Sequence, residues 1–294
     1  MRKRCITTAL AFCMAALILL LPENLRAAVP PDWTQEIPPF RIMGNLYYVG
    51  SKDLASYLIT TQRGHILINS NLVSSVPQIK ASVEKLGFHF SDVKILLISH
   101  GHWDHCAGSA LLKKLTGAQY MVMDSDVPTV ESGGKSDFHY GNDKTSYYPE
   151  TKVDRVLHDG DKVQLGDVVL IAYKTAGHTK GCTTWTVSVQ NHGKSYNVVI
   201  VGSPNVNQGY DLLRNRQYPQ IAADFEQSFR TWRALPCDIF LGAHGGYYGM
   251  LPKIARLNAG DTNAFVDPEG YQSYIAEREH AFRTELTKQR KAHP

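Results

Sequence analysis

The stretch that decides the fold is "SHGHWDH" at residues 99–105, which continues the apolar run "VKILLIS" at residues 93–99. A continuous apolar run of this length is typical of a strand that is covered on both faces. The chain passes from it into three histidines and an aspartate within one short turn. Because alternate residues of an extended chain share a face, His100, His102 and Asp104 can turn toward one point and bind a metal ion there.

Short apolar strands alternate with amphipathic helices on both sides of this stretch, from Phe40 to the C-terminus. Two β-rich halves are each flanked by helices, and no linker divides them. This pattern predicts one α/β domain with a four-layer sandwich, in which helices cover the outer faces of two central sheets. The expected strands lie at 46–50, 56–60, 65–69, 93–99, 159–179, 182–189, 196–203 and 237–246, and the expected helices at 74–87, 107–118, 221–235 and 267–290.

Two further histidines follow strands in the second half of the chain, His178 in "AGHT" and His244 in "GAHGG". The neighbouring glycines let the backbone approach a metal closely. Neutral imidazole and carboxylate are the ligands that zinc prefers in catalytic sites. His105 can point to a second metal beside the first. Five histidines and one aspartate then provide three ligands for each of two zinc ions and leave each ion the open position that marks a catalytic site.

Simpler interpretations of these residues remain open at this point. His178 or His244 alone is more often a surface or core residue than a ligand, and a histidine-rich turn can be a chance surface run. Ser99 beside His100 is a conceivable nucleophilic pair, but the glycine pattern of a nucleophile elbow is missing. The other histidines are interpreted as ordinary surface or core residues: His65, His89, His158, His192, His280 and His293.

The first 27 residues are typical of a secretory signal peptide. "MRKR" is positively charged, "ITTALAFCMAALILLLP" is apolar but slightly short for a membrane span, and "NLRAA" supplies small residues for cleavage. A retained anchor and, because of Cys13, a lipoprotein are the alternatives. We expect residues 28–294 to form a single exported domain that is soluble and has no membrane attachment after cleavage.

Net charge and cysteine content narrow the function classes further. Three of the four net positive charges belong to residues 1–27, so the composition gives no support for nucleic-acid binding. Cys5 and Cys13 also leave with this segment. An odd number of cysteines in an oxidising compartment builds no complete disulfide framework, and those that remain are Cys106, Cys182 and Cys237.

The pattern "HxHxDH" after an apolar strand, then "GH", then a late "H" resembles the metallo-β-lactamase superfamily over residues 40–290. The stretches at 133–149, 176–185 and 218–246 resemble its subclass B3 in particular. The resemblance implies the αβ/βα fold of that superfamily and a hydrolytic centre with two zinc ions. In the B3 pattern, His100, His102 and His178 would bind the first zinc ion, and Asp104, His105 and His244 the second.

Two positions favour subclass B3 over its relatives. His105 stands where subclasses B1 and B2 carry arginine. Ser203 stands where those subclasses carry a cysteine ligand and where superfamily thioesterases and lactonases commonly place a bridging aspartate. Asn69 is a departure, since an aspartate often supports the metal site there, although an amide can still hydrogen-bond a ligand histidine. The resemblance also implies that the three remaining cysteines are neither metal ligands nor disulfide-bonded: Cys106, Cys182 and Cys237.

This resemblance implies a periplasmic β-lactamase that hydrolyses the amide bond of penicillins, cephalosporins or carbapenems and confers antibiotic resistance. Water activated at the two zinc ions would attack the carbonyl, and Asp104 would orient it, so no covalent enzyme intermediate is needed. The loop at 202–210 either binds the substrate or is an ordinary polar turn. Its candidate substrate-binding residues are Ser203, Asn205 and Asn207.

Two other classes of function compete with this interpretation. One is a different dizinc hydrolase of the same fold, such as a lactonase or thioesterase, and the other is a non-catalytic zinc-binding protein. The export signal, Ser203 and the short chain after His244 argue against the first. We expect a small-molecule β-lactam substrate, no nucleic-acid partner and a monomer. The aromatic loop at 136–149 and Trp33 either border the cleft or pack beneath it.

Overall fold

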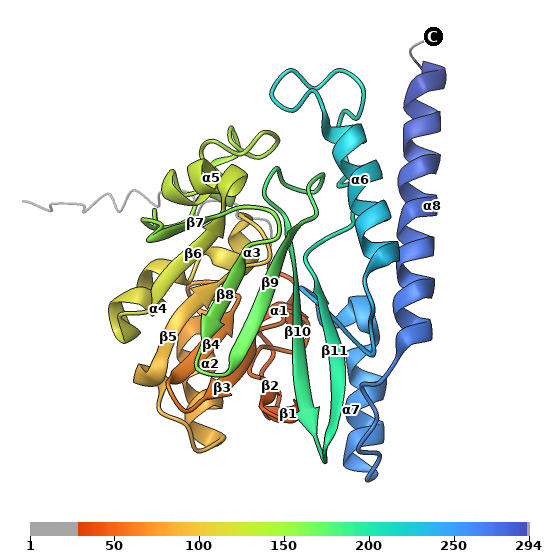
Figure 1. Cartoon of the computed structure of the whole chain (residues 1–294). Coiled ribbons are helices and arrows are strands. Elements are labelled where there is room, and N and C mark those ends of the chain that lie inside the picture. The colour runs from red at the N-terminus through yellow and green to blue at the C-terminus, as the bar shows by residue number, and fades with distance from the viewer. Residues whose placement is uncertain (1–28, 293–294) are drawn as a thin grey trace, which may run out of the picture.

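Two β-sheets pack face to face between two layers of helices, which confirms the predicted four-layer sandwich (Figure 1). The computed structural model describes residues 29–292. In the first sheet the strands follow chain order; the pairs from β1 to β4 are antiparallel, and those from β4 to β7 are parallel. This sheet contains β1 (Phe40–Met43), β2 (Leu46–Tyr48), β3 (Tyr57–Thr61), β4 (Gly64–Ile68), β5 (Val93–Leu97), β6 (Gln119–Met123) and β7 (Arg155–Leu157).

The second sheet has the strand order β12-β11-β10-β9-β8. Strands β8 to β11 form an antiparallel meander, and β12 pairs parallel to β11. Parallel neighbours need a crossover connection, which helix α6 provides between β11 and β12. This sheet contains β8 (Lys162–Leu165), β9 (Val168–Lys174), β10 (Thr183–Asn191), β11 (Lys194–Val201) and β12 (Ile239–Gly242).

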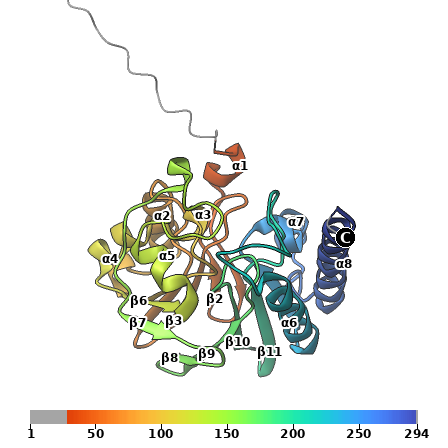
Figure 2. The same cartoon turned by 90° about the horizontal axis from the view of Figure 1, so that it is seen from above.

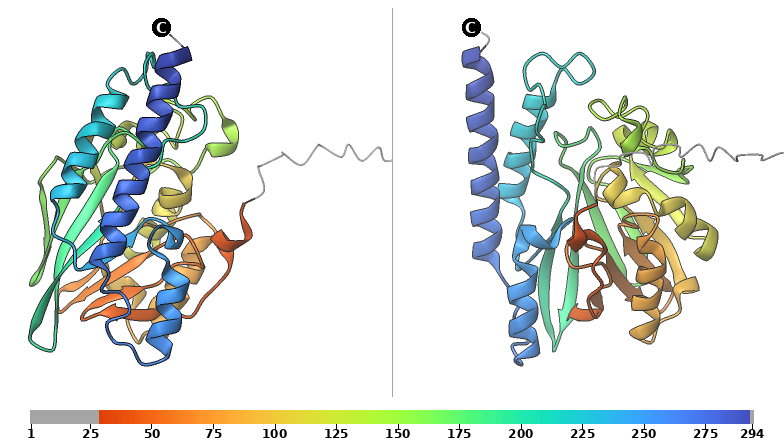
Figure 3. Two further views of the ribbon diagram at one scale, coloured as in Figure 1. Left: turned by 90° about the vertical axis from the view of Figure 1, so that its right-hand side faces the viewer. Right: turned by 180° about the vertical axis from the view of Figure 1, so that it is seen from behind.

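The helices divide between the two outer layers (Figure 2). Helices α2, α4 and α5 lie beside the first sheet, whereas α6 and α8 lie side by side on the second (Figure 3). The α-helices are α1 (Pro31–Thr34), α2 (Ser75–Lys85), α3 (Trp103–Cys106), α4 (Ser109–Thr116), α5 (Val127–Glu131), α6 (Ile221–Ala234), α7 (Met250–Asn258) and α8 (Pro268–Ala292). Short 3-10 helices occupy Phe90–Asp92, Asp124–Asp126, Lys144–Ser146 and Gly245–Tyr248.

Strands β3 to β5 are apolar on both faces because each face packs against a different layer. Leu58 and Leu67 belong to the core under α2 and α4. Their neighbours Ile59 and Ile66 belong to the core between the two sheets. Successive side chains of a strand point to opposite faces, so an uninterrupted apolar run is what this position requires.

Two expected elements differ in extent from those in the structure. The helix expected at 107–118 is α4 alone (Ser109–Thr116), which starts directly after Gly108 and is separate from the short helix α3 before it. A Cβ at Gly108 would lie 2.6 Å from the carbonyl oxygen of Ser70, so only glycine allows this close approach. The strand material expected at 159–179 is a hairpin of β8 and β9, which turns at Gly166 with a φ of 60°.

Helix α8 is the longest helix, with 25 residues, but charged side chains occur along all of it. Among residues 29–292, no helix is both long enough and apolar enough to span a membrane. The signal peptide predicted at residues 1–27 lies outside the described residues.

Candidate metal centre

The turn at residues 99–105 is fixed from both sheets. The N–H of Ser99 donates to Asn69 Oδ1 over 2.7 Å, and its carbonyl accepts from the N–H of Thr183 over 2.7 Å. Helix α3 starts directly after His102, and the N–H of His105 donates to the His102 carbonyl over 3.0 Å. This helical turn brings His105 back over the extended residues before it.

The imidazoles predicted for the first metal converge from two loops. One nitrogen from each of His100, His102 and His178 lies within 4.8 Å of the other two. The ring centroids of His100 and His178 are 4.6 Å apart. His178 follows β9, so the second sheet contributes this ligand to a set that starts in the first.

The residues predicted for the second metal also lie together. Asp104 Oδ2 is 3.2 Å from His105 Nε2 and 3.6 Å from His244 Nε2. The rings of His105 and His244 are 4.8 Å apart and perpendicular. His100 borders this group as well, because one of its ring nitrogens lies within 4.8 Å of a carboxylate oxygen of Asp104 and a ring nitrogen of His105. All six candidate ligands therefore occupy one cluster.

Burial and neighbouring charge move the pKa values in this cluster in opposite directions. Burial, together with the nearby imidazoles, lowers the pKa of His178 to about 3, so this ring is neutral. Burial also acts to lower the pKa of His244, but the carboxylates of Asp104 and Asp53 outweigh it and raise that pKa to about 9. The pKa of Asp104 is well below its ordinary value, since His105 and His244 outweigh the effect of burial. At neutral pH the cluster thus combines a neutral imidazole, His178, with a protonated one, His244, and the ionised carboxylate of Asp104.

Four of the five imidazoles face an outer partner through one ring nitrogen, which leaves the other nitrogen for a metal. Such partners fix the tautomer and orientation of a metal-binding histidine. The contacts are His100 Nδ1 to Ser99 Oγ at 3.3 Å, His102 Nε2 to Asp137 Oδ2 at 3.5 Å, His178 Nδ1 to the Asn205 carbonyl at 2.8 Å, and His244 Nδ1 to Asp53 Oδ2 at 2.8 Å.

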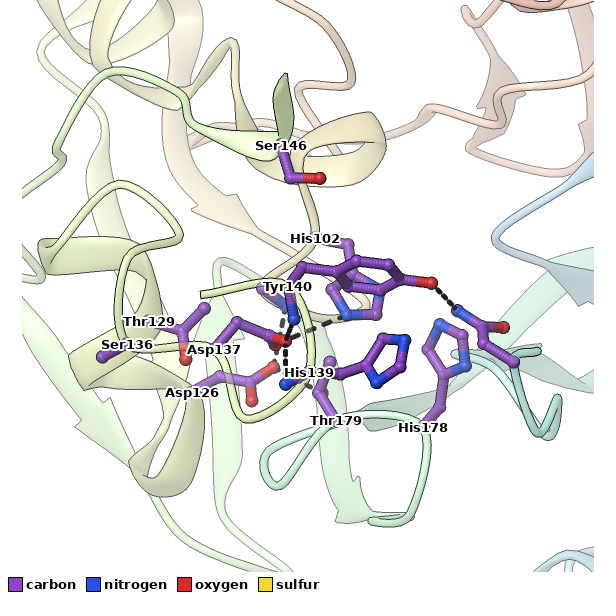
Figure 4. Close-up of polar contacts among 12 residues, drawn as sticks. His102, Asp126, Thr129, Ser136, Asp137, His139, Tyr140, Ser146, His178 and Thr179 are labelled. Carbon is purple, nitrogen blue, oxygen red and sulfur yellow. Dashed lines mark hydrogen bonds and ion pairs between the residues drawn. The ribbon is translucent and has the colours of Figure 1, made fainter. Parts of the chain in front are cut away.

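The two ligand-bearing loops are joined by Asp126, whose side chain is fully buried near His102 (Figure 4). Its Oδ2 accepts from the N–H of Gly101 over 2.8 Å and from Thr179 Oγ1 over 2.7 Å. Its Oδ1 accepts from the N–H of Gly181 over 2.8 Å. A Cβ at Gly181 would lie 2.5 Å from the backbone nitrogen of Asp126, so the loop after β9 packs directly against the segment that carries Asp126. Asp126 therefore sets the spacing between the first and second halves of the site.

The donor set fits a metal ion of the zinc class. Both ring nitrogens of His105 are buried without a hydrogen-bond partner, which is costly unless another group binds them. Imidazole and carboxylate are zinc ligands, whereas the thiols are absent from both ligand groups. The cysteines of the described chain are free, and Cys106 Sγ donates to the His102 carbonyl over 3.1 Å.

A cavity of about 240 Å³ opens beside the cluster. Of the predicted substrate-binding residues, Asn205 and Asn207 line it, but Ser203 does not. Ser203 is completely buried, and its Oγ lies 3.3 Å from Tyr247 Oη, so Tyr247 stands between it and the cavity. The lining residues are Trp33, His102, Trp103, Asp104, His105, Tyr140, His178, Asn205, Asn207, His244 and Tyr247.

The aromatic side chains near the site divide between cavity wall and core. Trp33 borders the cavity, with its ring 5.7 Å from that of His244. In the loop at 136–149, Tyr140 lines the cavity, while Phe138 is buried against Tyr210 with a centroid distance of 5.0 Å. Tyr148 donates its hydroxyl to the Gly101 carbonyl over 2.6 Å. In this loop, Tyr140 therefore borders the cavity, whereas Phe138 packs beneath it.

Sequence reasoning missed the carboxylates that support the ligands. Asp53 and Asp126 stand in "SKDLAS" and "DSDVP", where nothing distinguishes them from ordinary turn residues. Asp137 stands two residues before His139 in the aromatic loop, where an aspartate that accepts from following backbone N–H groups is a recognisable turn signal. Their proximity to the histidines depends on loop packing, which the sequence pattern does not encode.

Comparisons with known proteins agree with this geometry. A model of the metallo-β-lactamase superfamily matches residues 55–191. The native FEZ-1 metallo-β-lactamase from Legionella gormanii is 57% identical, with a TM-score of 0.86 over 87% of this chain and 98% of that one. BJP-1, a subclass B3 metallo-β-lactamase of Bradyrhizobium japonicum, is 35% identical, with a TM-score of 0.83 over 89% of this chain and 98% of that one.

A metal-dependent hydrolase from Anaeromyxobacter dehalogenans is more distant, at 25% identity over 209 residues, which are 70% of this chain and 67% of the relative. The superfamily match and the clustered imidazoles define a metal-dependent hydrolase of the αβ/βα fold. Within that class, this chain belongs to the subclass B3 metallo-β-lactamases.

Proposed function

We propose that this protein is an exported dizinc β-lactamase that hydrolyses the amide bond of β-lactam antibiotics. The observation that carries the proposal is the single cluster of five imidazoles and one carboxylate, open to a cavity, in a chain 57% identical to a metallo-β-lactamase. Activity of this kind would confer antibiotic resistance on the producing cell.

The ligands divide between two zinc ions according to their position in the cluster. His100, His102 and His178 would hold the first ion. Asp104, His105 and His244 would hold the second. When bound, zinc supplies Lewis acidity, which polarises a carbonyl group and makes hydroxide available near neutral pH.

The side chains around the metal site would orient the attacking water and supply negative charge beside it. Asp104 lines the cavity with its ionised carboxylate and would orient the attacking water. Ser99 is 1% exposed, and its Oγ faces His100 Nδ1, so it supports a ligand and has no access to a substrate. We therefore expect hydrolysis to proceed without a covalent intermediate on Ser99.

Substrate contacts would come from the loop after β11. Asn205 and Asn207 line the cavity and carry amide groups that can hydrogen-bond the substrate carboxylate. Ser203 would act on the substrate only through Tyr247, whose hydroxyl also accepts from Asn205 Nδ2 over 2.9 Å. We therefore expect the two asparagines to contact the substrate more directly than the buried serine.

The mature protein would act in the periplasm on small β-lactams, as a monomer without nucleic-acid or membrane partners. Support for export comes from the charged and apolar segments of residues 1–27.

The test is hydrolysis of a penicillin, a cephalosporin and a carbapenem by the purified protein, measured by loss of β-lactam absorbance. We expect turnover of at least one of them, loss of turnover with a chelator, and recovery with added zinc. A lactone and a thioester serve as comparison substrates for the other hydrolases of this fold. Turnover of these esters without any chelator-sensitive β-lactam hydrolysis would overturn the proposal.

A further inference from the structure

Asp137 is a buried carboxylate outside the six candidate ligands, at the start of the aromatic loop (Figure 4). Its Oδ1 accepts from the N–H groups of His139 and Tyr140 over 2.8 and 2.7 Å. Its Oδ2 lies 3.5 Å from His102 Nε2. One carboxylate therefore contacts a ligand imidazole and fixes a turn of the neighbouring loop at the same time.

The contact decides which nitrogen of His102 is available to a metal. An ionised carboxylate only accepts hydrogen bonds, so it favours the tautomer with the proton on Nε2 and a free lone pair on Nδ1. His102 Nε2 is buried and has no other partner. At 3.5 Å the contact is longer than a good hydrogen bond, and a small rotation of the ring would close it.

The same carboxylate also places Tyr140. The ring of this tyrosine packs perpendicular to His102, with centroids 5.2 Å apart. Its hydroxyl accepts from Asn207 Nδ2 over 2.9 Å, so Tyr140 joins the aromatic loop to the loop at 203–209 across the cavity.

We propose that Asp137 is a positioning residue for the metal centre, which holds His102 with Nδ1 free for the metal and, through Tyr140, places Asn207 at the cavity wall. The effect on metal binding does not depend on the identity of the substrate. The effect on Asn207 rests on the proposed β-lactamase function. The two parts therefore need separate measurements.

The first measurement needs no variant. Long-range ¹H–¹⁵N NMR of the metal-free protein, at a pH where His102 is neutral, reports which ring nitrogen carries the proton. We expect the proton on Nε2. A neutral His102 with its proton on Nδ1 would overturn the proposal.

The second measurement compares Asp137→Asn with Asp143→Asn. Asp143 lies in the same loop and likewise accepts from a following N–H, that of Thr145, over 2.9 Å, but it is exposed. In Asp137→Asn the amide oxygen can still accept from the backbone, while the amide NH₂ faces His102 and favours the wrong tautomer. Competition with a chromophoric chelator should show zinc affinity weakened about 10- to 100-fold in Asp137→Asn. The affinity of Asp143→Asn should stay within about 3-fold of wild type.

Metal-free thermal unfolding separates positioning from a general loss of structure. If both variants unfold at similar temperatures and only Asp137→Asn loses zinc affinity, Asp137 acts through His102. If Asp137→Asn binds zinc as tightly as Asp143→Asn, the proposal is wrong.

Tyr140→Phe tests the path to Asn207, because it removes the hydroxyl and leaves the contact between Asp137 and His102 intact. We expect unchanged zinc affinity and a raised KM for β-lactams. An unchanged KM would refute this second part alone. If wild type hydrolyses no β-lactam but Asp137→Asn still weakens zinc binding, the proposed function fails while the positioning role stands.

Discussion

The two halves of this molecule contribute to the metal centre in different ways. The first sheet supplies four candidate ligands from the single turn after β5, at residues 100–105. The second sheet supplies one ligand after β9, His178, and one after β12, His244. The first group is local in sequence, whereas the second reaches the site only through tertiary structure. A complete site therefore requires the halves to pack in one relative position.

Hydrogen bonds between the halves maintain that position, and three of these contacts lie beside the ligand turn. Trp185 Nε1 donates to the Ile98 carbonyl over 3.0 Å, directly before the ligand turn. The N–H of Thr183 donates to the carbonyl of Ser99 over 2.7 Å. Asp126 joins the loops that carry His102 and His178. We therefore predict that loss of His178 or His244 lowers activity as much as loss of a ligand in the turn at 100–105. Removal of a contact between the halves should have a smaller effect on stability and zinc binding.

The largest effect should follow from removal of a ligand that the second sheet supplies. We expect His178→Ala or His244→Ala to lower kcat/KM for a β-lactam by more than about 100-fold. Loss of a residue that only hydrogen-bonds a metal ligand typically costs less than this. The zinc content of each variant, measured after dialysis, should fall as well. The reason is that the remaining ligands on the turn after β5 do not complete either group of three.

His280→Ala is the matched control, because His280 is exposed on α8 and contacts none of the six ligands. All three variants should show a native circular dichroism spectrum. Near-normal turnover in either ligand variant would show that the ligand assignment is wrong.

Asp126→Ala should have the next largest effect, on stability as well as on metal binding. It leaves three buried donors without an acceptor, and each such donor costs about 1 to 3 kcal/mol. Since removal of a buried carboxylate offsets part of this cost, we expect the free energy of unfolding to fall by about 3 kcal/mol. Urea unfolding of the metal-free protein measures it.

Asp124→Ala is the control two residues away, where the carboxylate is partly exposed and pairs with Lys174 Nζ at 2.8 Å. An exposed pair contributes about 1 kcal/mol or less. Equal losses of stability in the two variants would mean that the buried bonds of Asp126 stabilise the protein no more than this exposed ion pair does.

Trp185→Phe should have a smaller effect that is confined to the contact between the halves. It removes one buried hydrogen bond, to the Ile98 carbonyl, which is worth about 1 to 2 kcal/mol. Trp232→Phe removes a comparable bond of 2.8 Å to Thr184 Oγ1, within the second half. Both should lower the melting temperature similarly, but only Trp185→Phe should weaken zinc binding. Equal zinc affinities would show that the Ile98 contact does not position the ligand turn.

The contrast between the halves also explains what the sequence could reveal. The ligand turn follows an apolar strand and was predictable from its spacing, as was the four-layer fold from the alternation of strands and helices. His178 and His244 became candidates because each follows a strand beside glycine. Asp53 and Asp137 were missed, since an aspartate in a loop carries no local sign of the histidine that it contacts. Ser203 was assigned a substrate contact, but its burial behind Tyr247 depends on side-chain packing.

We expect the smallest effect from a substitution of Asn69, which supports the ligand turn from within the first half of the molecule. Its backbone has a φ of 68°, which asparagine tolerates, and its side chain accepts from the N–H of Ser99 and donates to the Ala55 carbonyl over 3.3 Å. These bonds hold the strand end before the ligand turn and involve no ligand imidazole. Asn69→Asp keeps the acceptor and loses the donor, so we expect a loss of about 1 kcal/mol in stability and a change in zinc affinity below about 3-fold. A large drop in zinc affinity, measured by chelator competition, would instead place Asn69 among the residues that orient the ligands.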